Sequence, residues 1–179
     1  MQREIKGFEI KFARLKEGEH DYQYELDKAF FEEFSYADFS DAKFDVRTKL
    51  IKKAHAMELE VSIEGQALVQ CDVSLDYFWL PLSTQGRLEI KFGSGFDDTN
   101  DEVLWLPETE HSFNVAQYLF ELAALAKPLK TVDPEVKAGK KAQETLRRLE
   151  ELSPDNQQAS ANKDQDIDPR WEKLRDLLN

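Results

Sequence analysis

The chain has 179 residues, a net charge of −12, and 34% charged beside 41% hydrophobic residues. This length suits one domain with an appendage, and the apolar fraction excludes a wholly disordered chain. No run approaches the roughly 18 apolar residues of a membrane helix, and the first residues lack the apolar stretch of a signal peptide, so we expect a cytoplasmic protein that does not enter a membrane. The single cysteine excludes an internal disulfide and every cysteine-rich zinc site.

The first two thirds of the chain show the alternation of strands that bury one face. Apolar and polar side chains alternate over residues 8–12, 22–26, 43–50 and 57–64. Between the second and third of these segments, Asp27 is placed to cap a short helix over residues 28–34.

Further strands are expected after Gly65. The alternation continues through residues 67–73, turns near Leu75 and resumes over residues 77–82 and 87–92. Residues 93–102 combine acidic residues with turn formers, which predicts an exposed loop before a short strand over residues 103–107.

The most regular helical pattern covers residues 114–127 and ends before Pro128. Most of its apolar side chains share one broad face, so we expect this helix to pack on the sheet. The residues of that face are Val115, Tyr118, Leu119, Leu122, Leu125 and Ala126.

The composition changes after residue 130. Residues 131–152 predict an amphipathic helix, residues 153–167 a polar flexible linker, and residues 168–179 a short helix that begins at Asp168 and Pro169. The last helix carries an apolar stripe that would dock on a partner, although docking on the protein's own sheet fits the pattern equally well. The residues of this candidate docking element are Arg170, Trp171, Leu174, Leu177 and Leu178.

No catalytic or metal-binding constellation emerges from the sequence. The three histidines lack paired spacing, and the acidic residues 97–102 lack the glycine and glutamate of an EF-hand loop. Cys71 falls on the buried side of an alternating segment, where thiols are usually inert. We therefore expect no enzyme activity, no metal and no cofactor; a metal-dependent nuclease would have to draw its carboxylates from residues 97–102.

The excess of Asp and Glu over Lys and Arg argues against a general RNA binder, because such proteins neutralise phosphates with Lys and Arg. One strand face is nevertheless basic, and its spacing of roughly 7 Å per two residues resembles that of successive phosphates. The residues of this candidate RNA contact are Lys43, Arg47, Lys49 and Lys53. Ion pairing with Glu58, Glu60 and Glu64 on the next strand is the alternative and the commoner role for exposed charges.

Four segments in order resemble the YceD family, described as large ribosomal RNA subunit accumulation proteins. They are LKEGEHDYQYELDKAFFEEF, IEGQALVQCDVSLDYFWLPL, LPETEHSFNVAQYLFELAALAKPLK and DPRWEKLRDLL. Many members have Cys-Asp-Arg-Cys-Leu in the second segment, where this chain has Val73 and Ser74 in place of the arginine and the second cysteine. A zinc or thiol-pair role is therefore not carried over. The resemblance implies a non-enzymatic role in the accumulation of the large ribosomal subunit and its RNA.

Together the patterns predict an α+β fold over residues 1–130: a twisted antiparallel sheet or partly open β-barrel of about seven strands, covered by the 114–127 helix and followed by a helical and flexible tail. With the resemblance, the leading hypothesis is a non-catalytic factor in large-subunit assembly that binds a ribosomal protein or a pre-ribosomal particle, with direct or indirect contact to rRNA. The alternatives are a generic acidic adaptor for basic proteins and, less favoured, an RNA-processing nuclease.

Overall fold

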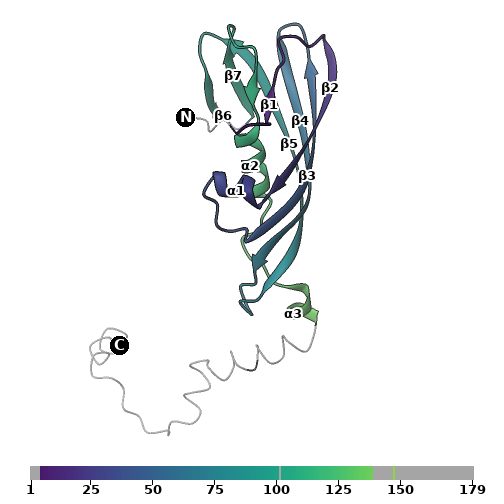
Figure 1. Ribbon diagram of the computed structural model, residues 1–179, viewed down its shortest axis with the longest axis vertical. Coiled ribbons are helices and arrows are strands. Elements are labelled where there is room, and N and C mark those ends of the chain that lie inside the picture. Colours follow the sequence, from purple (N-terminus) through teal and green to yellow (C-terminus); the bar gives the residue numbers. More distant parts are fainter. Residues whose placement is uncertain (1–4, 101, 139–146, 148–179) are drawn as a thin grey trace, which may run out of the picture. The chain divides into compact units, whose positions relative to one another are not determined.

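The computed structural model describes residues 5–100, 102–138 and 147 of the chain. The chain divides into two units, the first ending at Asp133 and the second beginning at Pro134. The first unit has the α+β fold that the sequence predicts, with a six-stranded twisted sheet and two helices among its described residues (Figure 1). Two short strands, β1 (Glu9–Ile10) and β8 (Phe113–Asn114), form a separate two-stranded sheet.

The six-stranded sheet has the order β2-β3-β4-β5-β7-β6 and is open, because its end strands β2 and β6 do not pair with each other. Its strands are β2 (Gly18–Asp27), β3 (Asp41–Lys52), β4 (Ala56–Gln70), β5 (Tyr77–Gly93), β6 (Asp97–Asn100) and β7 (Val103–Pro107). The first four are antiparallel neighbours in chain order. One pair departs from the antiparallel pattern, since β7 runs parallel to β5.

Several strand boundaries differ from the sequence-based expectation. Residues 77–82 and 87–92 belong to one 17-residue strand, because the 15-residue strand β4 offers a continuous partner. The expected loop over residues 93–102 is exposed but contains β6. Every side chain of β6 is exposed, so this strand leaves no alternation in the sequence and is defined by its backbone pairing with β7.

Helix α1 (Lys28–Glu33) begins where the sequence predicts it. Oδ1 of Asp27 accepts a hydrogen bond from the N–H of Phe30 at 3.0 Å, which satisfies one free N–H of the first turn. The buried rings of Phe30 and Phe31 then join a cluster of phenylalanines beneath the sheet.

Helix α2 (Ala116–Leu125) is the expected core helix, two residues shorter at each end. Its buried residues are Ala116, Leu119 and Ala123, whereas Leu125 is 81% exposed. The expectation that Leu125 belongs to the packed face is wrong, because it lies about 120° around the helix from Leu119.

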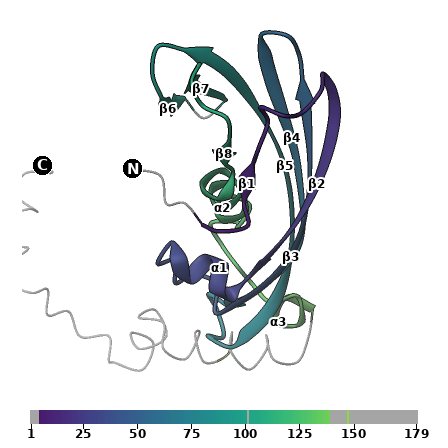
Figure 2. The same ribbon diagram turned by 45° about the horizontal axis from the view of Figure 1, so that its top comes forward.

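Both helices of the first unit lie on the concave side of the curved sheet (Figure 2). The core forms between them and the inward side chains of the strands. We call the opposite, convex side of β2, β3, β4 and β5 the outer face; no helix of the described first unit covers it.

Of the second unit the structure describes α3 (Pro134–Ala138) and residue 147. The rest of the helix expected over residues 131–152, the linker expected over 153–167 and the helix expected over 168–179 lie outside the described residues.

Candidate functional site

The outer face carries side chains in rows that run across the strands. In this register each residue lies opposite one residue of the next strand, so outward side chains of β2 to β5 become cross-strand neighbours. Two of these rows are formed by charged residues, and they lie on the same face as an exposed aromatic pair.

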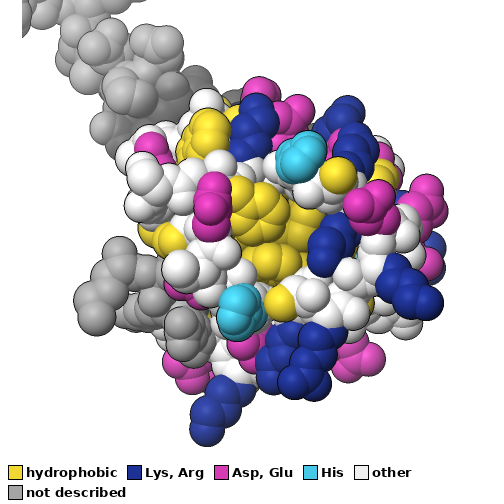
Figure 3. Space-filling view, turned by 90° about the horizontal axis from the view of Figure 1, so that it is seen from above, with side chains coloured by type: hydrophobic (Ala, Val, Ile, Leu, Met, Phe, Trp, Pro, Cys, Tyr) yellow, Lys and Arg dark blue, Asp and Glu magenta, His cyan; other side chains and the backbone are white. Residues whose placement is uncertain are grey.

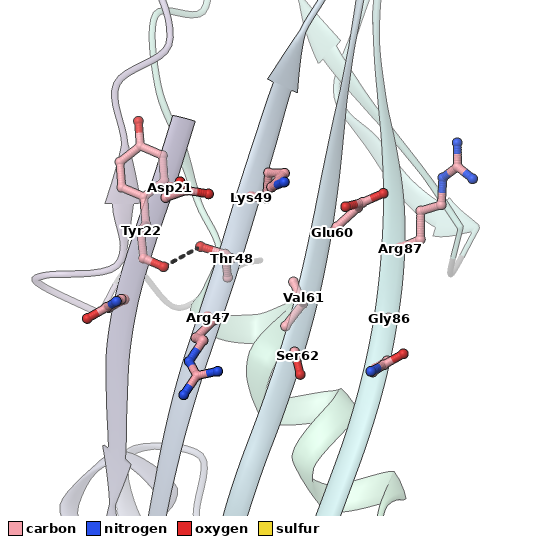
Figure 4. A pocket seen from close by; sticks show the side chains of 12 residues that line it. Asp21, Tyr22, Arg47, Thr48, Lys49, Glu60, Val61, Ser62, Gly86 and Arg87 are labelled. Atoms are coloured by element: carbon pink, nitrogen blue, oxygen red, sulfur yellow. Dashed lines mark hydrogen bonds between the residues drawn. The ribbon is translucent and has the colours of Figure 1, made fainter. Parts of the chain in front are cut away.

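The first row alternates in charge: Asp21, Lys49, Glu60 and Arg87 are successive partners on β2, β3, β4 and β5. Figure 4 shows these four side chains side by side across the sheet, along a shallow groove of about 840 Å³. The strongest contacts of its cations reach outside the row. Nζ of Lys49 lies 3.0 Å from Oε2 of Glu19, a hydrogen bond that raises the pKa of Lys49, and Nε of Arg87 lies 2.7 Å from Oε1 of Glu58.

The second row is acidic throughout: Glu25, Asp45 and Glu64 are successive partners on β2, β3 and β4. It ends at Ser83 on β5. All three carboxylates are exposed, and none forms an ion pair with a described residue. Like charges directly opposite one another destabilise a sheet, so this acidic row is an arrangement that a bound cation would stabilise.

Sequence reasoning missed the acidic row. Alternation placed each of its members on a solvent-facing side, but nothing in the sequence shows that three carboxylates from three strands come into register. The order β2-β3-β4 and the connections between these strands decide that.

The candidate RNA contact is partly engaged within the protein. Lys43, Arg47 and Lys49 project from the outer face of β3, whereas Lys53 lies beyond the end of that strand in the β3–β4 turn. The ammonium groups of Lys43 and Lys53 both have partners, the first 5.3 Å from the centre of the Trp79 ring and the second 3.4 Å from Oε2 of Glu58.

Ion pairing therefore accounts for Lys49 and Lys53, of which Lys53 has an expected partner and Lys49 a different one. Glu58 is the one expected carboxylate that pairs, while Lys49 turns to Glu19 of β2. Arg47 forms no ion pair with a described residue.

Two aromatic residues at the start of β5 are exposed on the outer face. The side chain of Tyr77 is 60% exposed and that of Trp79 is 36% exposed. Tyr77 lies opposite the polar Gln70 on β4, and Trp79 lies opposite Leu68. They add an apolar contact area to an otherwise charged face.

Cys71 is fully buried, as the alternation predicts, but it begins the turn between β4 and β5 instead of lying within a strand. Its Sγ accepts hydrogen bonds from the N–H groups of Ser74 at 3.5 Å and Asp133 at 3.4 Å. Burial opposes a charged thiolate, but the hydrogen bonds from the N–H groups of Ser74, Asp133 and Val73 and from the Ser74 side chain together outweigh it, and the pKa of Cys71 lies below its ordinary value. The residue is therefore an acceptor inside a packed turn.

The same turn is bonded to the end of the first unit. The N–H of Thr131 donates to Oδ2 of Asp72 at 2.6 Å, and the N–H of Asp72 donates to the carbonyl of Thr131 at 2.8 Å. These bonds hold the β4–β5 turn and residues 131–133 as one element.

A second hollow opens at the end of the sheet near the β3–β4 turn. It has a volume of about 550 Å³ and is lined by Phe12, Phe92, Lys52 and His55 among others. Figure 3, which looks onto this end, shows hydrophobic side chains at its centre with charged and histidine side chains around them. Nζ of Lys52 donates to the carbonyls of Phe12 and Leu15 at 2.9 and 2.8 Å, so this cation is already used to hold the chain together.

The residues of the candidate docking element lie outside the described residues: Arg170, Trp171, Leu174, Leu177 and Leu178. Within the described part of the chain, no three His, Cys, Asp or Glu side chains are grouped to hold a metal ion. None of the described helices has the length and apolar character needed to cross a membrane.

The model of one protein family, described as "Large ribosomal RNA subunit accumulation protein YceD", matches residues 59–178, about two thirds of the chain. The chain belongs to the YceD family. The match includes most of β4, the turn with Cys71, β5 and α2, and it excludes β2 and β3. Neither the curated proteins nor the solved structures contain a match to the chain. The family description gives this chain a role in the accumulation of large-subunit ribosomal RNA.

Proposed function

We propose that this YceD family member is a non-catalytic, cytoplasmic factor that supports accumulation of large-subunit rRNA by holding a basic ribosomal protein on the outer face of its sheet. The acidic row of Glu25, Asp45 and Glu64 carries the proposal, because three adjacent carboxylates that form no ion pair with a described residue offer a site for Lys or Arg side chains.

Protein is favoured over RNA as the direct partner by the charges of the whole chain and of this face. A net charge of −12 repels phosphates and attracts basic chains at long range. Of the basic residues of the candidate RNA contact, Lys49 and Lys53 pair with carboxylates and Lys43 lies against Trp79, so a phosphate would have to compete for them.

The link to rRNA accumulation follows from the chemistry of such a partner. Proteins that pack against rRNA carry clusters of Lys and Arg, which bind any nucleic acid through its phosphates before assembly. An acidic sheet that covers these clusters would keep the protein available for the assembling large subunit. Without that supply, large-subunit rRNA would lack a protein that it needs to form a stable particle.

The experiment uses the full chain as immobilised bait for RNA-free protein extracted from purified large ribosomal subunits. We expect one or a few basic ribosomal proteins to be retained, and their dissociation constants are then measured. The triple variant Glu25→Gln, Asp45→Asn, Glu64→Gln should bind roughly tenfold or more weakly, since each contact between opposite charges is worth up to about 1 kcal/mol.

A matched control removes three other exposed carboxylates, Asp98→Asn, Glu102→Gln and Glu108→Gln, and keeps the same net charge as the first variant. An equal loss of affinity in both triple variants would show that long-range attraction alone holds the partner, without a site on the outer face. Retention of no ribosomal protein by the wild-type chain would contradict the proposal. Tagged protein recovered from its own cells with and without RNase separates the partner classes, because an RNA contact predicts that RNase releases the ribosomal proteins.

A further inference from the structure

One long stretch of strand β5 has no neighbouring strand on one side. β4 pairs with β5 from Tyr77 to Lys91, whereas β7 pairs only with Glu89–Gly93. Residues 77–88 therefore form an edge within the sheet, which we call the free edge. Apart from β4, no described residue forms a backbone hydrogen bond with it.

The ladder shows which backbone groups of the free edge are unpaired. In an antiparallel pair, hydrogen-bonded and non-bonded residues alternate. The N–H of Cys71 donates to the carbonyl of Asp76 at 2.8 Å, so Tyr77 is the first residue whose N–H and C=O point away from β4. Every second residue from there does the same, up to Glu89, whose N–H donates to the carbonyl of Glu102 at 2.8 Å.

The residues of the free edge that present backbone groups to the open side are Tyr77, Trp79, Pro81, Ser83, Gln85 and Arg87. The position of Pro81 agrees with this alternation of paired and unpaired residues. A proline within a sheet is tolerated where its missing N–H faces an unpaired side, and position 81 has that parity. Carbonyl groups along the whole edge remain available, as do the N–H groups of the other five residues.

Apolar side chains flank the free edge on both sides of the sheet. Tyr77 and Trp79 are exposed on the outer face, while Phe78 and Leu80 are half-buried against the core on the inner face. A strand added at this edge would place its side chains alternately beside each pair. Backbone hydrogen bonds and apolar side-chain contacts would thus both hold the added strand.

The acidic row runs to this edge. Ser83 is the cross-strand partner of Glu64, and its small side chain leaves the way open from the edge to the carboxylates of Glu64 and Asp45. A Lys or Arg opposite Ser83 on an added strand would extend over it toward these charges. The edge and the acidic row therefore favour the same occupant, an extended segment that carries basic side chains.

We propose that a basic, extended segment of the ribosomal protein partner adds to residues 77–87 of β5 as a further strand of the sheet. This inference rests on the proposed function, because it specifies how the basic partner is bound. Backbone pairing supplies affinity, the aromatic pair covers apolar side chains of the segment, and the acidic row selects a cation opposite Ser83.

The test removes N–H groups of the free edge, and its control removes the same side chains while keeping those N–H groups. The variant Ser83→Pro, Gln85→Pro loses two donors on the open side and none that bonds to β4, whereas Ser83→Ala, Gln85→Ala loses the same side chains and keeps both donors. With the ribosomal protein retained from the RNA-free extract as probe, the proline pair should bind roughly tenfold or more weakly than the alanine pair.

Equal affinity of the proline and alanine pairs would overturn the edge proposal. The proposed function would survive that result if the acidic-row triple variant still lost binding, and it would fail with the edge proposal if that variant also bound like the wild type. Should the proline pair not fold, amide hydrogen exchange of the wild-type chain decides: the N–H groups of Trp79, Ser83 and Gln85 should exchange more slowly when the probe is bound, and unchanged rates would refute the added strand.

Discussion

Gly86 of β5 lies so close beneath Leu122 of α2 that a Cβ atom on Gly86 would stand 2.6 Å from Cδ1 of Leu122. The same Cβ would be 2.7 Å from Oη of Tyr118. The absence of a side chain at this position is what lets the core helix approach the sheet. The contact joins the strand that carries the free edge to the helix that supports it from the inner side.

Gly86→Ala should lower the free energy of unfolding by about 1–3 kcal/mol, because α2 must shift or its side chains must leave their rotamers. Urea unfolding measures the effect. Adding Leu122→Ala should recover part of the loss by making room for the new methyl group. Gly95→Ala is the control, since a Cβ there meets nothing within 4 Å, and an equal loss in that variant would contradict this explanation.

Tyr24→Phe should leave stability unchanged or raise it by about 1 kcal/mol. Oη of Tyr24 is buried and has no hydrogen-bond partner among the described residues, while Oγ1 of nearby Thr48 donates to the carbonyl of Tyr22. The ring would keep its stacking on Phe8, where the centroids are 5.1 Å apart. A clear loss of stability on thermal or urea unfolding would mean that the hydroxyl has a partner after all.

Alkaline pH should destabilise the fold through the same tyrosine. Burial raises the pKa of Tyr24 from 10.0 to about 12, and burial likewise raises the pKa of Tyr118 to about 12. Because the unfolded chain gives up these protons first, the stabilisation is complete below about pH 10 and is lost as the pH rises towards 12. Unfolding measured across this range should show a smaller decline in Tyr24→Phe than in the wild-type chain, and parallel curves would contradict the assignment.

Asp45→Asn should make the free protein more stable and its complex weaker. Removing the middle charge of the acidic row relieves repulsion from Glu25 and Glu64 on both sides, worth about 0.2–1 kcal/mol at low salt. The gain should shrink as added salt screens the charges. Asp98→Asn, an exposed carboxylate outside the row, should change neither quantity, and a destabilised Asp45→Asn chain would argue that the row is neutralised within the protein.

Cys71→Ala should lower the free energy of unfolding by about 1–3 kcal/mol and leave partner binding intact in the folded chain. The change leaves a small cavity and deprives the N–H groups of Ser74 and Asp133 of their acceptor. Cys71→Ser keeps an acceptor and should lose less. Metal analysis of the purified wild-type chain is expected to find less than stoichiometric zinc, and tightly bound zinc that disappears in the variant would restore a metal role for this position.

The sequence by itself determined those elements that depend on interactions between residues close together in the chain. The alternation over residues 43–50 and 57–64 identified the buried faces of β3 and β4, because a strand turns successive side chains to opposite sides. Asp27 marked the start of α1 because its carboxylate lies within reach of the third N–H of the helix. The family resemblance, carried by segments in order, also needed no structure.

The tertiary structure alone decided which residues face one another across the sheet. Alternation assigns Asp45 and Glu64 to a face, but only the register between β3 and β4 makes them neighbours. The parallel pairing of β7 with the last residues of β5, which leaves residues 77–88 as a free edge, depends on where the chain returns after β6. Strand order and register arise from long-range packing and loop geometry, and the periodicity of a single segment carries no information about its neighbour.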